Sequence, residues 1–232
     1  MKYFFLLLAY IFNYSPKAVL VPHHNVYKEI RAELLQKINQ DRLITNHIIL
    51  IGPSHFAPNP SGIYYGDYYK FDKKLFDKID FPITLNNDLI KSDHTFYNLV
   101  PDLKAYFPQA KIIPILMGEK YSFEKLELLI LKLKKYCTRD CLILASIDFT
   151  HYTNQYLANK WDKKTIKALQ NFDFESIKNA KIDSPQSLYI FSKYSYLNNI
   201  KKFNLYKNTY AFETSHIYGV YLKYAKTRYN SN

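Results

Sequence analysis

Short segments of almost uninterrupted apolar residues alternate with longer segments of helical apolar spacing, and this alternation is the strongest constraint on the fold. The apolar segments lie at residues 18–21, 47–51, 111–116 and 141–147. Between them, residues 25–39 and 122–136 repeat apolar residues at intervals of three and four, as one face of a helix does. Strands that are apolar on both faces need helices on both sides. We therefore predict an α/β fold, a single domain whose central, mainly parallel β-sheet is flanked by helices on both faces.

The rest of the chain extends this pattern. Further elements are expected as helices at 96–107, 155–170 and 184–197 and as closing strands near 201–207 and 216–224. Ser184 followed by Pro185 is a typical helix start. The 232 residues suffice for one sizeable domain, which we place at 19–228. A Tyr-rich loop at 63–71 is expected to cover the site as an apolar lid with polar tips.

Residues 1–18 form a hydrophobic leader that differs from the rest. Lys2 precedes an apolar stretch at 3–12, and the small residue Ala18 ends the segment. These features resemble an export signal, although Pro16 stands where a second small residue is expected. An uncleaved anchor and an extra β-strand are the alternatives, so export, membrane anchoring and a cytoplasmic location all stay open. Membrane contact is expected only through this leader, because no apolar run reaches the roughly 18–20 residues that cross a bilayer.

Composition excludes several classes of protein. With 48% hydrophobic and 22% charged residues, the chain is not a disordered tail, a collagen or a coiled coil. The net charge is +12, but the basic residues are mostly dispersed lysines, so we expect a small-molecule partner and no nucleic acid. Cys137 and Cys141 are interpreted as packing residues, with a local disulfide as the alternative if the protein is exported.

Histidines follow the predicted strands. His23 and His24 follow the first strand, His55 follows the second, and His151 follows the strand at 141–147. The carboxyl ends of parallel strands meet at one edge of a sheet, where open α/β sheets bind their ligands. His94 opens a predicted helix beside Asp93, and His216 opens the last strand; only His47, at a strand start, lies outside the pattern.

This arrangement predicts a metal pocket. Imidazole is a ligand for zinc, iron, copper and nickel, and three imidazoles leave coordination positions open for a substrate. The sequence gives little support for other kinds of site, since the chain has no phosphate-binding glycine motif of the P-loop or dinucleotide type. It also lacks the Gly-x-Ser-x-Gly elbow of serine hydrolases.

Five segments, in order and over roughly residues 19–224, resemble the Memo family, known in prokaryotes as AmmeMemoRadiSam system protein B. They are Val21-Pro22-His23-His24, Ile49-Leu50-Ile51-Gly52-Pro53-Ser54-His55, Asp93-His94-Thr95, Pro108-Gln109-Ala110-Lys111-Ile112-Ile113-Pro114-Ile115-Leu116 and Ala145-Ser146-Ile147-Asp148-Phe149-Thr150-His151-Tyr152. The resemblance implies a fold similar to class III (LigB-type) non-haem iron extradiol dioxygenases and a histidine-lined metal pocket with a redox role.

By motif match, His55 and His94 take the positions of two family metal ligands. His24, Asp148 and His151 would line the same pocket. The third family ligand is a cysteine near the start of a C-terminal strand, and here that region reads Glu213-Thr214-Ser215-His216. His216 is the expected replacement, with Glu213 as a second candidate. The chain also has Tyr97 where the family usually carries a Glu.

These observations lead to one main hypothesis and two alternatives. The main one is a metal-dependent redox enzyme, similar to dioxygenases, in which His55, His94 and His216 bind one divalent iron or copper ion. His24 or His151 would then act as acid and base, oriented by Asp148. The alternatives are a metal- or small-molecule-binding module without turnover, and a zinc hydrolase.

Overall fold

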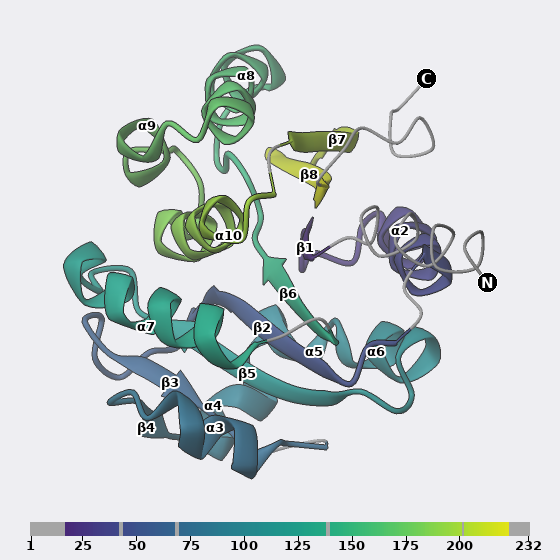
Figure 1. Cartoon of the computed structure of the whole chain (residues 1–232). Coiled ribbons are helices and arrows are strands. Elements are labelled where there is room, and N and C mark those ends of the chain that lie inside the picture. The colour runs from purple at the N-terminus through teal and green to yellow at the C-terminus, as the bar shows by residue number, and fades with distance from the viewer. Residues whose placement is uncertain (1–16, 42–43, 68–69, 138–139, 201, 223–232) are drawn as a thin grey trace.

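The computed structural model describes residues 17–41, 44–67, 70–137, 140–200 and 202–222. They form one α/β unit around an eight-stranded sheet of order β4-β3-β5-β2-β6-β1-β8-β7 (Figure 1). The predicted leader lies outside the described residues except for Lys17 and Ala18, the latter being the first residue of β1. Within the described residues, no helix combines the length and the apolar character that crossing a membrane requires.

The centre of the sheet is parallel, as predicted. It consists of β1 (Ala18–Val21), β6 (Cys141–Ser146), β2 (His47–Pro53) and β5 (Lys111–Met117). Val21 pairs with Ser146 and Ile51 pairs with Ala145, so the carboxyl ends of these strands lie side by side. The edges are β3 (Ile63–Tyr65) with β4 (Thr84–Leu85), and β8 (Thr214–Leu222) with β7 (Lys202–Ala211). β3 and β8 join the centre in antiparallel orientation.

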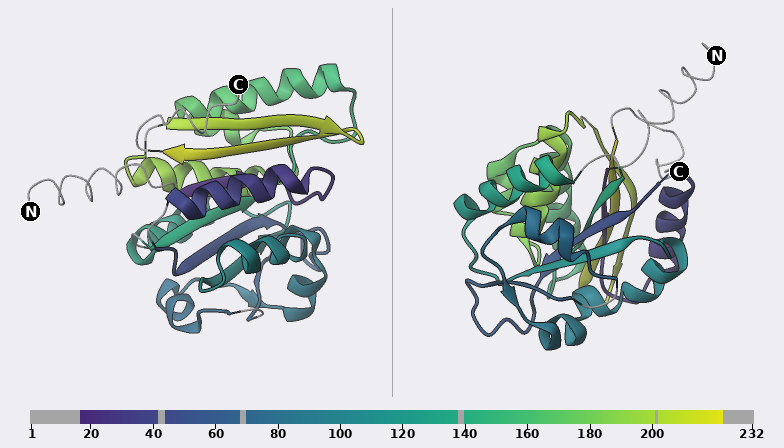
Figure 2. Two further views of the ribbon diagram at one scale, coloured as in Figure 1. Left: turned by 90° about the vertical axis from the view of Figure 1, so that its right-hand side faces the viewer. Right: turned by 60° about the horizontal axis from the view of Figure 1, so that its bottom comes forward.

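Helices cover both faces of the sheet (Figure 2). The core on one face includes side chains of α3 (Lys73–Ile79), α7 (Phe123–Tyr136), α8 (Gln155–Asn171), α9 (Phe174–Lys178) and α10 (Pro185–Leu197). The core on the other face includes α2 (Lys28–Asp41), α4 (Asn87–Ser92), α5 (His94–Tyr97) and α6 (Val100–Tyr106). The predicted α/β class is therefore confirmed.

Strand β2 shows why the apolar segments predict this layering. Ile49 and Ile51 belong to one core, and Ile48 and Leu50 belong to the other. Successive side chains of a strand point to opposite faces, so an uninterrupted apolar run is apolar on both. All four side chains are fully buried. Each such burial stabilises the fold by about 1.5–3 kcal/mol.

Two sequence predictions are wrong. Residues 63–65 of the predicted lid form strand β3, in which Tyr64 is buried and its hydroxyl accepts a hydrogen bond from the Asn59 amide at 3.0 Å. The three-residue strand is too short to show a period in the sequence. Cys137 and Cys141 are buried, but as a disulfide that joins the end of α7 to the start of β6 rather than as free packing residues.

Candidate metal centre

Six of the histidines gather at the carboxyl edge of the central strands, as the sequence predicts. They are His23, His24, His55, His94, His151 and His216. His23 and His24 follow β1, His55 follows β2 and His151 follows β6, so the parallel register brings distant segments together. The seventh, His47, lies at the opposite end of β2, where its ring nitrogens contact Asp72 at 2.8 Å and Asp140 at 3.2 Å.

The first group consists of three imidazoles. One ring nitrogen from each of His23, His55 and His94 lies within 4.8 Å of the others. The ring centroids are 3.8 Å apart for His55 and His94, and 4.9–5.0 Å apart for the two pairs that include His23. Burial, followed by the neighbouring imidazoles, lowers the pKa of His23 well below the usual histidine value and also lowers the pKa of His94. These two rings are therefore neutral at physiological pH, which is the form that binds metals.

Asp93 orients His55. Its Oδ1 lies 3.0 Å from His55 Nδ1, and its Oδ2 accepts the His55 backbone N–H at 2.8 Å. The same carboxylate caps α5 by accepting the Thr95 N–H at 3.0 Å. Burial alone would raise the pKa of Asp93, but the bonds from His55 and Thr95 lower it overall, so the carboxylate is charged. With Nδ1 directed at Asp93, Nε2 of His55 is left for a ligand, as in carboxylate–histidine–metal sites.

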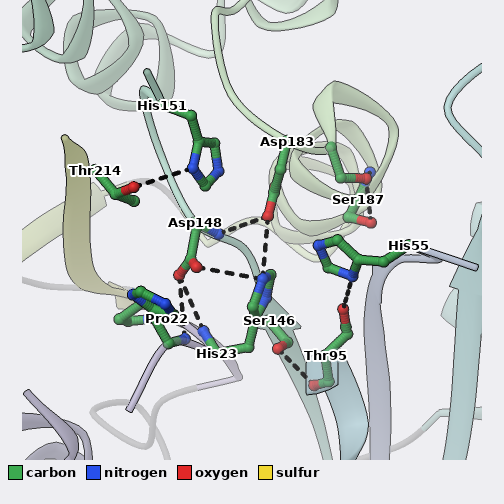
Figure 3. Close-up of polar contacts among 12 residues, drawn as sticks. Pro22, His23, His55, Thr95, Ser146, Asp148, His151, Asp183, Ser187 and Thr214 are labelled. Atoms are coloured by element: carbon green, nitrogen blue, oxygen red, sulfur yellow. Dashed lines mark hydrogen bonds and ion pairs between the residues drawn. The ribbon is translucent and has the colours of Figure 1, made fainter. Parts of the chain in front are cut away.

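A glycine permits the close approach of these segments. A Cβ on Gly52 would lie 2.2 Å from Thr95 Cγ2 and 2.7 Å from the Ser146 carbonyl oxygen. The Ser146 hydroxyl also donates to the Thr95 carbonyl at 2.7 Å, which ties α5 to β6 (Figure 3). His94 and Asp93 therefore sit directly against β2, which His55 follows, and β6, which Asp148 and His151 follow.

His23 lies between two acids (Figure 3). Its Nε2 is 3.2 Å from Asp148 Oδ2 and 3.4 Å from Asp183 Oδ2. Asp183 in turn accepts the Asp148 backbone N–H at 2.9 Å. Burial, and then the nearby Asp148 charge, raise the pKa of Asp183 well above its usual range. Its protonated form is thereby favoured, which reduces the negative charge that the two carboxyl groups place beside the imidazole.

A buried arginine holds the turn that carries His23 and His24. The Arg31 guanidinium donates to the carbonyl oxygens of residues 22, 23 and 24 at 3.3–3.5 Å and pairs with Asp102 at 2.6 Å. Asn98 adds a bond from Nδ2 to the His23 carbonyl at 3.0 Å. The backbone of His23 is therefore held by α2 and the α5–α6 junction, in addition to the contacts that its ring makes with Asp148 and Asp183.

A second group lies next to the first. His24, Asp148 and His216 each offer a ligand atom within 4.8 Å of the other two. The rings of His24 and His216 are nearly parallel, at 9°, with Nδ1 of His24 3.4 Å from Nε2 of His216. His216 is fully buried, burial lowers its pKa, and its Nδ1 has no hydrogen-bond partner in the part of the chain that the structure describes.

His151 completes the pocket. Its Nδ1 lies 3.2 Å from Thr214 Oγ1 (Figure 3). Burial lowers the pKa of His151, with Asp148 acting in the opposite direction. A neutral imidazole whose orientation is fixed by a hydroxyl can accept a proton near neutral pH.

The structure brings the predicted residues together but divides them differently. His55 and His94 are grouped with His23, whereas the predicted third ligand, His216, is grouped with His24 and Asp148. His23 is thus the residue that the sequence reasoning left out of the ligand set, although its place after the first strand pointed to it. Asp183 gave no signal in the sequence, because only the packing of the loop before α10 brings it to the pocket.

The α/β architecture and the imidazole cluster at the strand ends define a class of protein with a histidine-lined pocket. A family model described as Memo-like protein matches residues 8–188, so the chain belongs to the Memo-like family. Among solved structures, the chain is similar to the uncharacterised protein JW3007 from Escherichia coli K12, with a TM-score of 0.61 and 12% identity over 89% of this chain and 99% of that one. At this identity the likeness shows the fold. No curated protein matches the sequence.

Proposed function

We propose that this protein is a metal-dependent redox enzyme, similar to dioxygenases, that binds one divalent ion through His23, His55 and His94 and acts on a small molecule. The observation that supports this most is the trio of imidazole nitrogens within 4.8 Å of one another. The donor set fits a transition metal, because two of the rings are kept neutral and the third is oriented by Asp93.

Three imidazoles leave open positions on most transition ions. Iron or copper would supply electron transfer, whereas zinc would supply only an activated water. Membership of the Memo-like family favours the hypothesis of a redox enzyme, so we rank iron or copper above zinc. A zinc hydrolase and a binding module without turnover are the alternatives.

The chain's own residues would handle the proton and the substrate. His151 is the proposed acid and base, since it is neutral and held by Thr214 near Asp148. Asp148 would fix His23 and the turn behind it through its bonds to Nε2 and to the backbone N–H groups of residues 23 and 24. Phe56 and Tyr152 directly follow His55 and His151 and are largely exposed, so the mouth of the pocket suits an amphipathic or aromatic substrate.

Purification under anaerobic conditions and elemental analysis test this proposal. We expect the His55→Ala/His94→Ala double variant to bind about one ion per chain less than the wild type, and the matched control His47→Gln to bind as much as the wild type. A double variant that binds as much metal per chain as the wild type would refute this ligand set. Oxygen consumption that depends on the metal would support the enzyme, and its absence under every reductant tried would favour the binding module. Zinc with esterase or amidase activity would favour the hydrolase.

A further inference from the structure

The distance between the rings of His24 and His216 suggests a second metal site beside the first group. The gap of 3.4 Å between His24 Nδ1 and His216 Nε2 is longer than an ordinary hydrogen bond of about 2.7–3.2 Å. Two nitrogens bound to one tetrahedral ion at about 2.0–2.1 Å stand about 3.4 Å apart. The pair is thus spaced as two ligands of one ion are.

The burial of His216 also supports its role as a ligand of an ion. Its side chain is fully buried, yet among the described residues Nδ1 has no hydrogen-bond partner, and the contact of Nε2 with His24 Nδ1 is a long one of 3.4 Å. A buried ring nitrogen without a hydrogen-bond partner costs free energy, so such nitrogens are rare unless a ligand binds the ring.

Asp148 supplies the third donor and links the two groups. Its carboxylate lies within 4.8 Å of the ligand atoms of His24 and His216. Oδ1 accepts the backbone N–H groups of residues 23 and 24, and Oδ2 lies 3.2 Å from His23 Nε2. Each carboxylate oxygen has two lone pairs; both are used on Oδ1, whereas Oδ2 has one contact and keeps a lone pair for an ion.

We propose that His24, Asp148 and His216 form a second metal site, so that the pocket holds two neighbouring divalent ions linked through Asp148. Two imidazoles and one carboxylate are a donor set for Zn²⁺ or Fe²⁺. Two neighbouring ions can stabilise the attacking and the leaving atom of one substrate at the same time. The proposal does not depend on the reaction assigned to the first group.

Metal titration of the full chain tests it. Protein stripped with a chelator is dialysed against Zn²⁺, and bound metal is measured by elemental analysis. We expect about two Zn²⁺ per chain in the wild type and about one in His216→Ala and in His24→Ala. The His55→Ala/His94→Ala double variant should also keep about one, and the control His47→Gln should keep both. His24→Ala is included because it is less buried than His216 and so disturbs folding less.

The outcomes separate the two proposals. A single ion that disappears in the double variant and persists in both His24→Ala and His216→Ala would overturn the second site and leave the first. A single ion that disappears in His24→Ala or His216→Ala and persists in the double variant would overturn the first site and leave the second. Loading with Co²⁺ adds an independent readout, since the visible spectrum should lose one component, rather than fade uniformly, in His24→Ala.

Discussion

Strand β2 carries a histidine at each end, and the two are used differently. Both ring nitrogens of His47 face carboxylates, Asp72 at 2.8 Å and Asp140 at 3.2 Å. His55 has a carboxylate on Nδ1 only, while the rings of His23 and His94 surround it. A histidine whose two ring nitrogens both contact carboxylates has no nitrogen left for a metal, whereas one with a carboxylate on a single nitrogen does. The partners of both ring nitrogens therefore distinguish a structural histidine from a candidate ligand.

The largest effect on stability is expected at Arg31, whose contacts lie at the end of the sheet where His55 follows β2. Arg31→Ala leaves Asp102 and the carbonyls of residues 22–24 without their partner in a buried place. We expect a loss of about 3–5 kcal/mol in the free energy of unfolding, measured by urea denaturation. Arg31→Lys should recover little of it, because an ammonium cannot reach the same set of acceptors. An unchanged unfolding midpoint would contradict this role.

The next largest effect concerns metal affinity. Asp93→Asn removes the charge that orients His55, while an amide oxygen can still cap α5. We expect metal affinity to fall about 10–100-fold, as measured by competition with a chelating dye. Asp72→Asn is the matched control, because it makes the same change beside His47. Equal losses in the two variants would remove the distinction between the two ends of β2.

A smaller effect should appear as pH dependence at the His47 end. Burial raises the pKa of Asp72, but the Leu75 N–H, His47 and Lys111 together lower it by more, so the net shift is downward. A lowered pKa gives stability that is present above the unfolded value of about 3.9 and is lost as pH falls through the folded value. Asp72→Asn should therefore cost up to about 1 kcal/mol at neutral pH and almost nothing at the acid end. Chemical denaturation at several pH values checks this, and a pH-independent difference would contradict it.

The smallest effect is expected for His47→Gln. The side chain is partly exposed, and its contacts with Asp72 and Asp140 lie at the start of β2. We expect a stability change within about 1 kcal/mol and unchanged metal content. Thermal unfolding and elemental analysis measure both, and loss of metal would show that the two ends of β2 are coupled.

The sequence predicts the sheet and the place of the pocket because both follow from periodicity. The apolar runs at 47–51 and 141–147 fix two buried strands, and chain direction then places the residues after them at one edge. Strand β3 escapes prediction because three residues carry no period. The pairing of Cys137 with Cys141 also escapes, since spacing alone does not settle whether two thiols are joined.

The division of the histidines into two groups could not be predicted either. His23 and His24 are adjacent in the chain, yet the turn held by Arg31 directs one toward His55 and the other toward His216. Side-chain direction in a turn depends on backbone angles that tertiary contacts impose. Sequence reasoning therefore locates the cluster but not the partners of each ring.

The close approach of Gly52 to Thr95 sets the spacing of the pocket with main-chain atoms and one methyl group. Flexible side chains can adjust their rotamers to ions of different radius, but such a contact cannot shorten, and α5 cannot move closer to β2. We therefore expect the main chain of residues 52–55 and 93–95 to keep its position when an ion binds. Crystals soaked with different metals should superpose along these two segments.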